Sequence, residues 1–422
     1  MHSRSYPTTR PIGFSPLEIS TRVLHRVVDM HASEAAFLWK QRDRATYAPH
    51  FALRHLSKLD ARLLAHLEGL TVAGEAGWRA AQAGLGEADA GALFAAAYLA
   101  FSTQRAQLMT QVLRIAASAP SFDRPLQAAL AWLDLDRLQP TLDRLSASDV
   151  PDFRRLALVT CTAHRSLALS LLSQCLRDDD PVLRARALRA IGETRQHKAL
   201  STARETLSDS VPICRFWAAW SVALLGDTTG ASVALAASEE LPNLQVVAIN
   251  VAMRCGDPLW ARDMVRWWAS NPSLRRTALR AAGALGDPAA VPWLIEHFDD
   301  PAHARIAGES FSMITGADLK YLDLNRDAPS SATDDVPEDE DLPWPDTAAI
   351  REWWSKASPR FTKGHRYLTG QPVSRAGAIR TLRDGFQRQR RAAAIELVCA
   401  SDASVLFPVD ARADWQCGRL AL

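Results

Sequence analysis

The stretch LRRTALRAAGALGDPAAVPWLIEHFDDP, residues 274–301, contains one complete unit of a pattern that runs through much of this chain. Each half carries an apolar stripe at helical spacing. The two stripes are Leu274, Ala278, Leu279, Ala282 and Leu285, followed by Val291, Leu294, Ile295 and Phe298. Between them, Gly286 suits a left-handed helix end, Asp287 suits an N-cap and Pro288 suits a first helical turn. The stretch therefore predicts two short helices joined by a tight turn.

The same unit recurs along the chain. The glycine that ends the first helix of each pair is found at Gly192, Gly226, Gly256, Gly286 and Gly316, at intervals of about 30 residues. Such a period is typical of solenoids, because one helix pair cannot bury both of its apolar stripes without neighbours. We therefore predict an all-α fold in which residues 76–320 form a solenoid of stacked helix pairs and residues 1–75 form a helical N-terminal cap.

The overall composition limits the possible partners and location. The chain has 422 residues, 48% of them hydrophobic, and a formal net charge of +2, so it carries no strong global field toward nucleic acid or a membrane. Its six cysteines contain no CxxC pair, which favours free thiols over disulfides or a zinc site. The N-terminal sequence has no apolar region of the kind found in secretory signals, and the longest apolar run, residues 90–101, is too short to cross a bilayer. We expect a cytoplasmic protein without a membrane partner.

Two resemblances add context. The repeat quoted above resembles the HEAT-like repeats of the phycobilisome-lyase type, which occur in lyases, hydroxylases and scaffolds. Five further segments resemble a bacterial family of HEAT-repeat proteins from type VI secretion gene clusters. They are HASEAAFLWKQRDRA (31–45), LDARLLAHLEGLTVAGEAGW (59–78), GESFSMITGADL (308–319), EDEDLPWPD (338–346) and GFQRQRRAAAIEL (385–397). This resemblance implies an adaptor or an immunity protein that binds a secretion component or a toxic effector, and it implies no catalytic mechanism.

After the repeats, the charge of the chain changes sign twice. Residues 321–346 are rich in Asp, Glu, Pro and Ser and predict a solvated acidic linker, in which Trp344 is either pinned to the solenoid or anchors a partner. Residues 347–422 predict a small basic helical module. Its candidate basic patch is Arg383, Arg388, Arg390 and Arg391. An electrostatic latch between linker and module is the simpler interpretation, and phosphate or nucleic-acid binding is the alternative.

No catalytic motif emerges from the sequence. None of the histidines is followed by glutamate, so the His-Glu dyads that hold iron in HEAT-repeat hydroxylases are missing, and HExxH, GxSxG, P-loop and GxGxxG motifs are missing too. His31, His50, His55 and His66 lie near carboxylates but match no known ligand spacing, so we interpret them as capping, core or surface residues. We expect no enzyme activity, no cofactor and no metal; a lyase-like HEAT-repeat enzyme remains an alternative.

A second alternative is a nucleic-acid-binding protein similar to the HEAT-like DNA glycosylases. Such a protein needs a basic concave face, and we expect the second helices of the pairs to line that face. These helices carry mixed charges. The residues are Lys198, Arg204, Arg262 and Arg266 against Glu205, Asp263 and Glu296. The mixture argues against a track for duplex DNA.

Tryptophans provide the remaining candidate site. Trp217, Trp220, Trp267 and Trp293 lie off the two core stripes of their repeats. They either pack between adjacent repeats or, where they face solvent, form a protein-binding surface. Together with Trp344 they are the candidate partner-binding residues of a non-enzymatic protein-binding scaffold.

Overall fold

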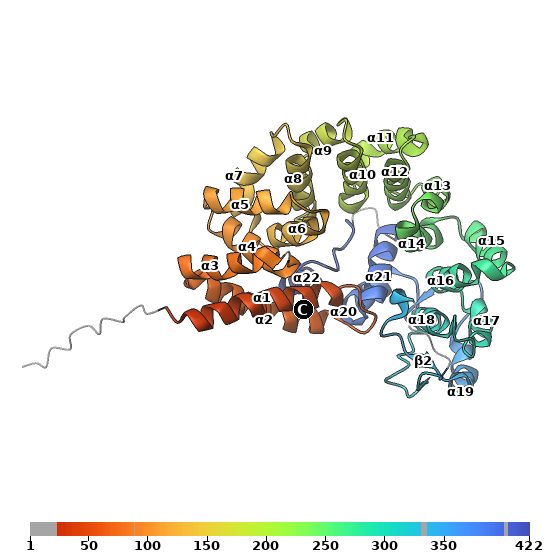
Figure 1. Ribbon diagram of the computed structural model, residues 1–422. Coiled ribbons are helices and arrows are strands. Elements are labelled where there is room, and N and C mark those ends of the chain that lie inside the picture. Colours follow the sequence, from red (N-terminus) through yellow and green to blue (C-terminus); the bar gives the residue numbers. More distant parts are fainter. Residues whose placement is uncertain (1–22, 88, 331–335, 401–403) are drawn as a thin grey trace, which may run out of the picture.

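A computed structural model describes residues 23–87, 89–330, 336–400 and 404–422, and within these ranges it contains 22 α-helices. The first described elements form a long helical hairpin, α1 (His25–Ala45) and α2 (Leu53–Val72). From α3 to α18, helices alternate between an outer and an inner layer, and the two layers curve into an arch (Figure 1). The predicted all-α solenoid is confirmed.

The inner layer consists of the first helix of each pair. Consecutive inner helices pack on one another along the arch. They are α4 (Ala90–Ser102), α6 (Asp123–Ala131), α8 (Pro151–Ala163), α10 (Pro181–Thr194), α12 (Pro212–Leu224), α14 (Gln245–Cys255), α16 (Arg275–Leu285) and α18 (Ala304–Thr315).

The outer layer consists of the helices on the convex side of the arch (Figure 1). They are α3 (Glu75–Ala83), α5 (Ala106–Ala116), α7 (Leu135–Ser146), α9 (Leu169–Leu176), α11 (Leu200–Glu205), α13 (Thr229–Ala237), α15 (Pro258–Ala269) and α17 (Val291–Glu296). The expectation that second helices line the concave side is therefore wrong. The direction in which a stack bends depends on packing between repeats, and the periodicity within one repeat does not define it.

The repeat at residues 274–301 forms as its residues predict. Helix α16 ends at Gly286, which adopts a left-handed φ of 80°, and the Asp287 carboxylate accepts a hydrogen bond from the Ala289 backbone N–H at 3.0 Å. Leu279, Leu285 and the other central residues of both stripes are buried in one continuous core. The local turn chemistry and the apolar stripes therefore produce the predicted helix pair.

The chain after α18 returns across the concave side of the arch. It contains two short antiparallel pairs, β1 (Asn325–Arg326) with β2 (Trp344–Pro345) and β3 (Tyr367–Leu368) with β4 (Gln371–Pro372). Four helices accompany them, α19 (Thr347–Ala357), α20 (Arg375–Asp384), α21 (Gln387–Cys399) and α22 (Ala413–Leu420). Helix α21 packs on the inner helices α12 and α14, and α22 packs on α2, so the C-terminal part closes the arch (Figure 1).

Two repeat glycines serve as docking points for the β3–β4 hairpin. The Tyr367 N–H donates to the Gly286 carbonyl at 2.8 Å, and a Cβ on Gly286 would lie 2.3 Å from the Tyr367 carbonyl oxygen. At the next repeat, a Cβ on Gly316 would lie 2.5 Å from the Thr369 carbonyl oxygen. These glycines are thus needed for close approach of the hairpin as well as for turn conformation.

Candidate functional site

The concave face of the solenoid is covered by the chain's own C-terminal part. Arg254 on α14 pairs with Glu396 on α21 at 2.9 Å, and each side chain is only 1% exposed. Further along, Arg195 donates to the Val398 carbonyl and Arg165 donates to the Leu406 carbonyl, both at 2.7 Å. Two of these three contacts end on backbone oxygens, so the inner helices hold α21 and Leu406 partly through their main chain. A partner does not reach this face in the closed molecule.

Glu193 on α10 is the acidic centre of this interface. Its carboxylate pairs with Arg189 at 2.8 Å and with Arg186 at 3.0 Å, and its backbone carbonyl accepts the Leu406 N–H at 3.3 Å. Burial alone would raise the pKa of Glu193, but the arginines outweigh that effect and hold the pKa below its ordinary value. The ionised carboxylate therefore neutralises part of the arginine charge on the inner face.

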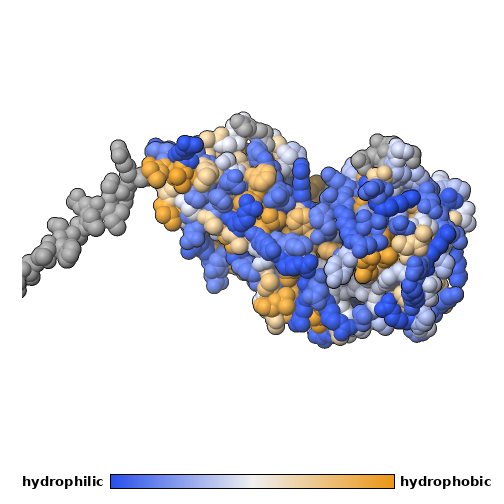
Figure 2. All heavy atoms as spheres, turned by 90° about the horizontal axis from the view of Figure 1, so that it is seen from below, coloured by the Kyte–Doolittle hydropathy of each residue, from blue (hydrophilic) through white to orange (hydrophobic). Residues whose placement is uncertain are grey.

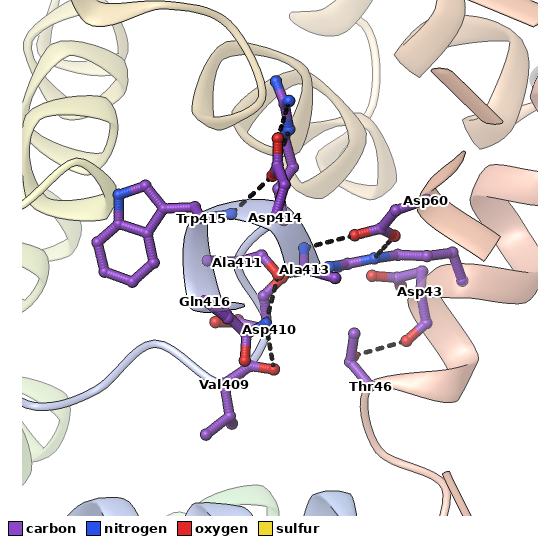
Figure 3. A network of polar contacts seen from close by, with 12 residues as sticks. Asp43, Thr46, Asp60, Val409, Asp410, Ala411, Ala413, Asp414, Trp415 and Gln416 are labelled. Carbon is purple, nitrogen blue, oxygen red and sulfur yellow. Dashed lines mark hydrogen bonds and ion pairs between the residues drawn. The ribbon is translucent and has the colours of Figure 1, made fainter. Parts of the chain in front are cut away.

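The last residues of the chain complete the closure against the N-terminal hairpin (Figure 3). The Asp60 carboxylate accepts hydrogen bonds from Arg42 at 2.9 Å and from the Ala413 backbone N–H at 2.7 Å. Arg42 also donates to the carbonyls of Asp410 and Ala411 at 2.7 Å. Arg42 and Asp60 are both buried, so this contact between chain segments more than 340 residues apart is part of the core.

The predicted basic patch does not form a surface. Arg390 is fully buried and donates to the Leu382 carbonyl and to the side chains of Gln387 and Gln416. The other three arginines are half-buried and also bind protein atoms. Arg383 donates to the Leu420 carbonyl at 2.7 Å, Arg388 forms a bidentate pair with Glu309 at 2.9 Å, and Arg391 donates to the Thr46 carbonyl at 3.0 Å. Because these guanidinium groups satisfy carbonyls and carboxylates where the arch closes, the patch that suggested nucleic-acid binding is absent from the described surface.

Several residues in the described part of the acidic linker pack against the solenoid, while others are exposed. Asp339 is buried and binds Arg276 on α16 at 2.5 Å, and Glu338 pairs with Arg280 on the same helix. The predicted latch therefore joins the linker mainly to the solenoid. From the basic module, Arg388 donates to the Glu338 carbonyl at 2.8 Å.

Trp344 lies in this packed linker. It is 8% exposed in β2, with the Arg305 guanidinium 5.0 Å from its ring centroid. It pins the linker to α18 of the solenoid, which is the first of the two alternatives. It is not available as a partner anchor.

The four repeat tryptophans divide into buried and accessible residues. Trp217 and Trp220 on α12 are buried, stack edge to face at 5.4 Å, and have Arg189 4.6 Å from the Trp217 ring centroid. Of the two alternatives, these two tryptophans follow the first, because they pack against α10 of the adjacent repeat. Trp293 on α17 is half-buried, with its ring 4.9 Å from His297. Trp267 on α15 is 59% exposed, and none of the other tryptophans is as accessible.

Trp267 is part of an apolar area on the convex side, which we call the α15–α17 surface and define as Leu259, Trp267 and Trp293. Leu259 lies on the same helix as Trp267 and is 68% exposed. Trp293 lies on α17, the next outer helix. The residue that corresponds to Trp267 in this next repeat is His297, four residues after Trp293. Two consecutive repeats thus present apolar side chains to solvent on rigid helices.

A second apolar area follows the start of α1. Val27, Met30 and Phe37 are between 41% and 54% exposed, and their spacing places them on one side of the helix. Figure 2 shows apolar side chains gathered there, next to the grey trace. This area contains none of the candidate tryptophans, and the helical spacing of its apolar residues is the only sign of it in the sequence.

One recess lies where four distant segments meet. Its volume is about 520 Å³, and its lining comes from the α1–α2 loop, the end of α18, the linker and the β3–α21 region. The charged lining residues are Arg54, Lys320, Arg380 and Arg388 together with Glu309, Asp318, Asp341 and Asp384. Positive and negative side chains are equal in number, so the recess favours no ligand of a single charge sign.

The N-terminal histidines do not assemble into a metal site in the described part of the chain, where no group of three metal-binding side chains is found. His31 and His66 share a hydrogen bond between their Nδ1 atoms at 3.0 Å. The pKa of His66 is lowered mainly by burial and also by the nearby His31. His55 accepts the Ala52 N–H at 3.1 Å, which is the expected capping role. His50 lies 3.8 Å from Asp341.

Comparison with known proteins agrees with the architecture. No curated protein and no solved structure matches the chain. No helix in the described ranges combines the length and the apolar character needed to cross a bilayer. Residues 168–240, which span α9 to α13, match the family model for HEAT repeats, and the helix pairs in this range are therefore similar to HEAT repeats within an all-α solenoid.

Proposed function

We propose that this protein is a non-enzymatic scaffold that binds another protein through the α15–α17 surface. The observation that carries the proposal is the 59% exposure of Trp267, on the same helix as Leu259, which is 68% exposed. Tryptophan is enriched among the residues that dominate binding energy, and burying its large ring supplies affinity with little loss of side-chain entropy. HEAT repeats commonly serve as such scaffolds, because their stacked helices present an extended rigid surface.

The closed concave face supports the choice of the convex side. Arg254, Arg195 and Arg165 already bind the chain's own C-terminal part, so an incoming partner would have to displace a buried ion pair and several hydrogen bonds. The α15–α17 surface needs no such displacement. Binding there leaves the fold unchanged, as in most complexes of preorganised partners.

We further infer that the partner belongs to a type VI secretion apparatus, as a structural component or as a toxic effector. The inference is supported by the resemblance of five segments, which include residues 31–45 and 385–397, to HEAT-repeat proteins from such gene clusters. The protein then acts in the cytoplasm as an adaptor or as an immunity protein.

Co-expression with each neighbouring gene product separates the two roles. Rescue of growth from a toxic neighbour supports an immunity protein. A stable complex with a spike or tip protein, without rescue, supports an adaptor. If no neighbour forms a stable complex, the type VI proposal is rejected.

The binding surface is tested with Trp267→Ala. We expect the dissociation constant of the identified complex to rise about 30-fold, which corresponds to about 2 kcal/mol, while the thermal midpoint stays unchanged because the ring is exposed. Phe37→Ala on α1 is the matched control, since Phe37 is 54% exposed on the other apolar area. Isothermal titration calorimetry measures both variants. Weaker binding by Phe37→Ala together with unchanged binding by Trp267→Ala would assign the partner to α1 and contradict the proposal.

A further inference from the structure

Two cysteines from distant parts of the chain point toward each other. Cys255 is the last residue of α14 and Cys399 is the last residue of α21, and their Sγ atoms are 2.9 Å apart. Of the six cysteines, all of which lie in the described ranges, only these two are within hydrogen-bond distance of one another. The contact joins the solenoid to the helix that covers its concave face.

Neighbouring side chains hold the two helix ends together. Arg254 precedes Cys255, and it forms the buried ion pair with Glu396, three residues before Cys399. Arg366 pairs with the same carboxylate and also donates to the Leu285 and Arg254 carbonyls. The thiols are therefore brought together by a charged and hydrogen-bonded cluster that exists whether or not they react.

We propose that Cys255 and Cys399 form a reversible disulfide that covalently fixes the C-terminal part over the concave face of the solenoid. The sulfur atoms need to approach from 2.9 Å to the bonded distance of about 2.05 Å, a shift that side-chain rotation can supply. This modification goes beyond the proposed scaffold function, because it concerns the closed state of the molecule and requires no partner.

A low-molecular-weight disulfide such as oxidised glutathione is the oxidant. The exposed Cys399 thiolate attacks one glutathione sulfur, which forms a mixed disulfide and releases one glutathione thiolate. The Cys255 thiolate then attacks Cys399 Sγ and releases the second glutathione. The two protein thiols lose two electrons and two protons, and one oxidised glutathione becomes two reduced molecules.

The order of these steps follows from the two environments. Cys399 is exposed, whereas Cys255 is half-buried. The hydrogen bond with Cys399, together with burial, raises the pKa of Cys255 well above its ordinary value. Cys255 therefore stays protonated at neutral pH and is the slower, resolving thiol, so disulfide formation should accelerate as the pH rises.

The experiment treats the purified full-length protein with oxidised glutathione at about pH 8 and then removes the reagent. We expect two of the six thiols to disappear in a denaturing thiol assay, and the peptide map to show the Cys255–Cys399 linkage. Because the bond closes a loop of more than 140 residues, the thermal midpoint should rise by about 5 °C and return after reduction.

Serine variants provide the controls. Cys255→Ser and Cys399→Ser should each abolish the internal linkage and the rise in midpoint. Cys417→Ser should leave both intact, since Cys417 has no cysteine neighbour within hydrogen-bond distance. Retention of all six thiols, glutathione bound to Cys399 as the end product, or disulfide-linked dimers would each overturn the proposal. The peptide map of the unsubstituted protein gives this answer even if a variant fails to fold.

Discussion

A Glu396→Ala variant is expected to lose about 3 to 5 kcal/mol of unfolding free energy. The Glu396 carboxylate is 1% exposed and pairs with Arg254, whose side chain is equally buried, and with Arg366. Removing the carboxylate leaves the Arg254 charge in the interior without its counter-ion, and burying an uncompensated charge costs far more than losing an exposed ion pair. Urea unfolding followed by circular dichroism measures the loss.

Glu352→Ala is the matched control for this measurement. Glu352 also pairs with a cation, Lys356, at 2.6 Å, but both side chains are at least 70% exposed on α19. Its removal should leave the urea midpoint unchanged, because water and salt already screen the pair. Equal midpoints for Glu396→Ala and the parent protein would show that α21 is not docked on α14 through this cluster.

A Gly286→Ala variant is expected to be destabilised more strongly than Gly226→Ala, although the two glycines occupy equivalent repeat positions. Both have left-handed φ values, of 80° and 95°, so each substitution costs about 1 to 2 kcal/mol of backbone strain. At Gly286 the new Cβ would also lie 2.3 Å from the Tyr367 carbonyl oxygen, whereas nothing lies within 4 Å at Gly226. The hairpin must therefore shift only in the Gly286 variant, for a total loss of more than about 3 kcal/mol.

Urea midpoints of the two variants separate turn strain from hairpin docking. The Gly226→Ala midpoint reports strain alone, and the further decrease in Gly286→Ala reports displacement of β3. Identical decreases would mean that Tyr367 does not approach Gly286 in solution.

The repeat was predictable because its signals are local. Gly286, Asp287 and Pro288 define a helix end and a helix start within three residues, and the structure shows the expected left-handed φ and capping bond. Apolar stripes at helical spacing likewise identify the buried face of each helix, because the face depends only on periodicity. These features establish the fold without knowledge of any distant contact.

The closure of the arch was not predictable from the same signals. Arg388 and Glu309 are 79 residues apart, and an arginine in the sequence looks the same whether it is solvated or donates to a buried carbonyl. The register alone could not show that a neighbouring repeat covers Trp217 and Trp220. Long-range packing thus determined which candidate residues remained accessible.

Hydrogen–deuterium exchange of the C-terminal part tests the central claim, that this part closes the concave face. In the structure the Gln387 N–H bonds to the Phe51 carbonyl at 2.7 Å, the Leu406 N–H bonds to the Glu193 carbonyl, and the Ala413 N–H bonds to Asp60. We predict that peptides containing these amides exchange as slowly as the inner helices α10 and α14, because they open only when the core opens. Exchange of all three amides at the rate of an unstructured chain, while α10 and α14 stay protected, would contradict the account.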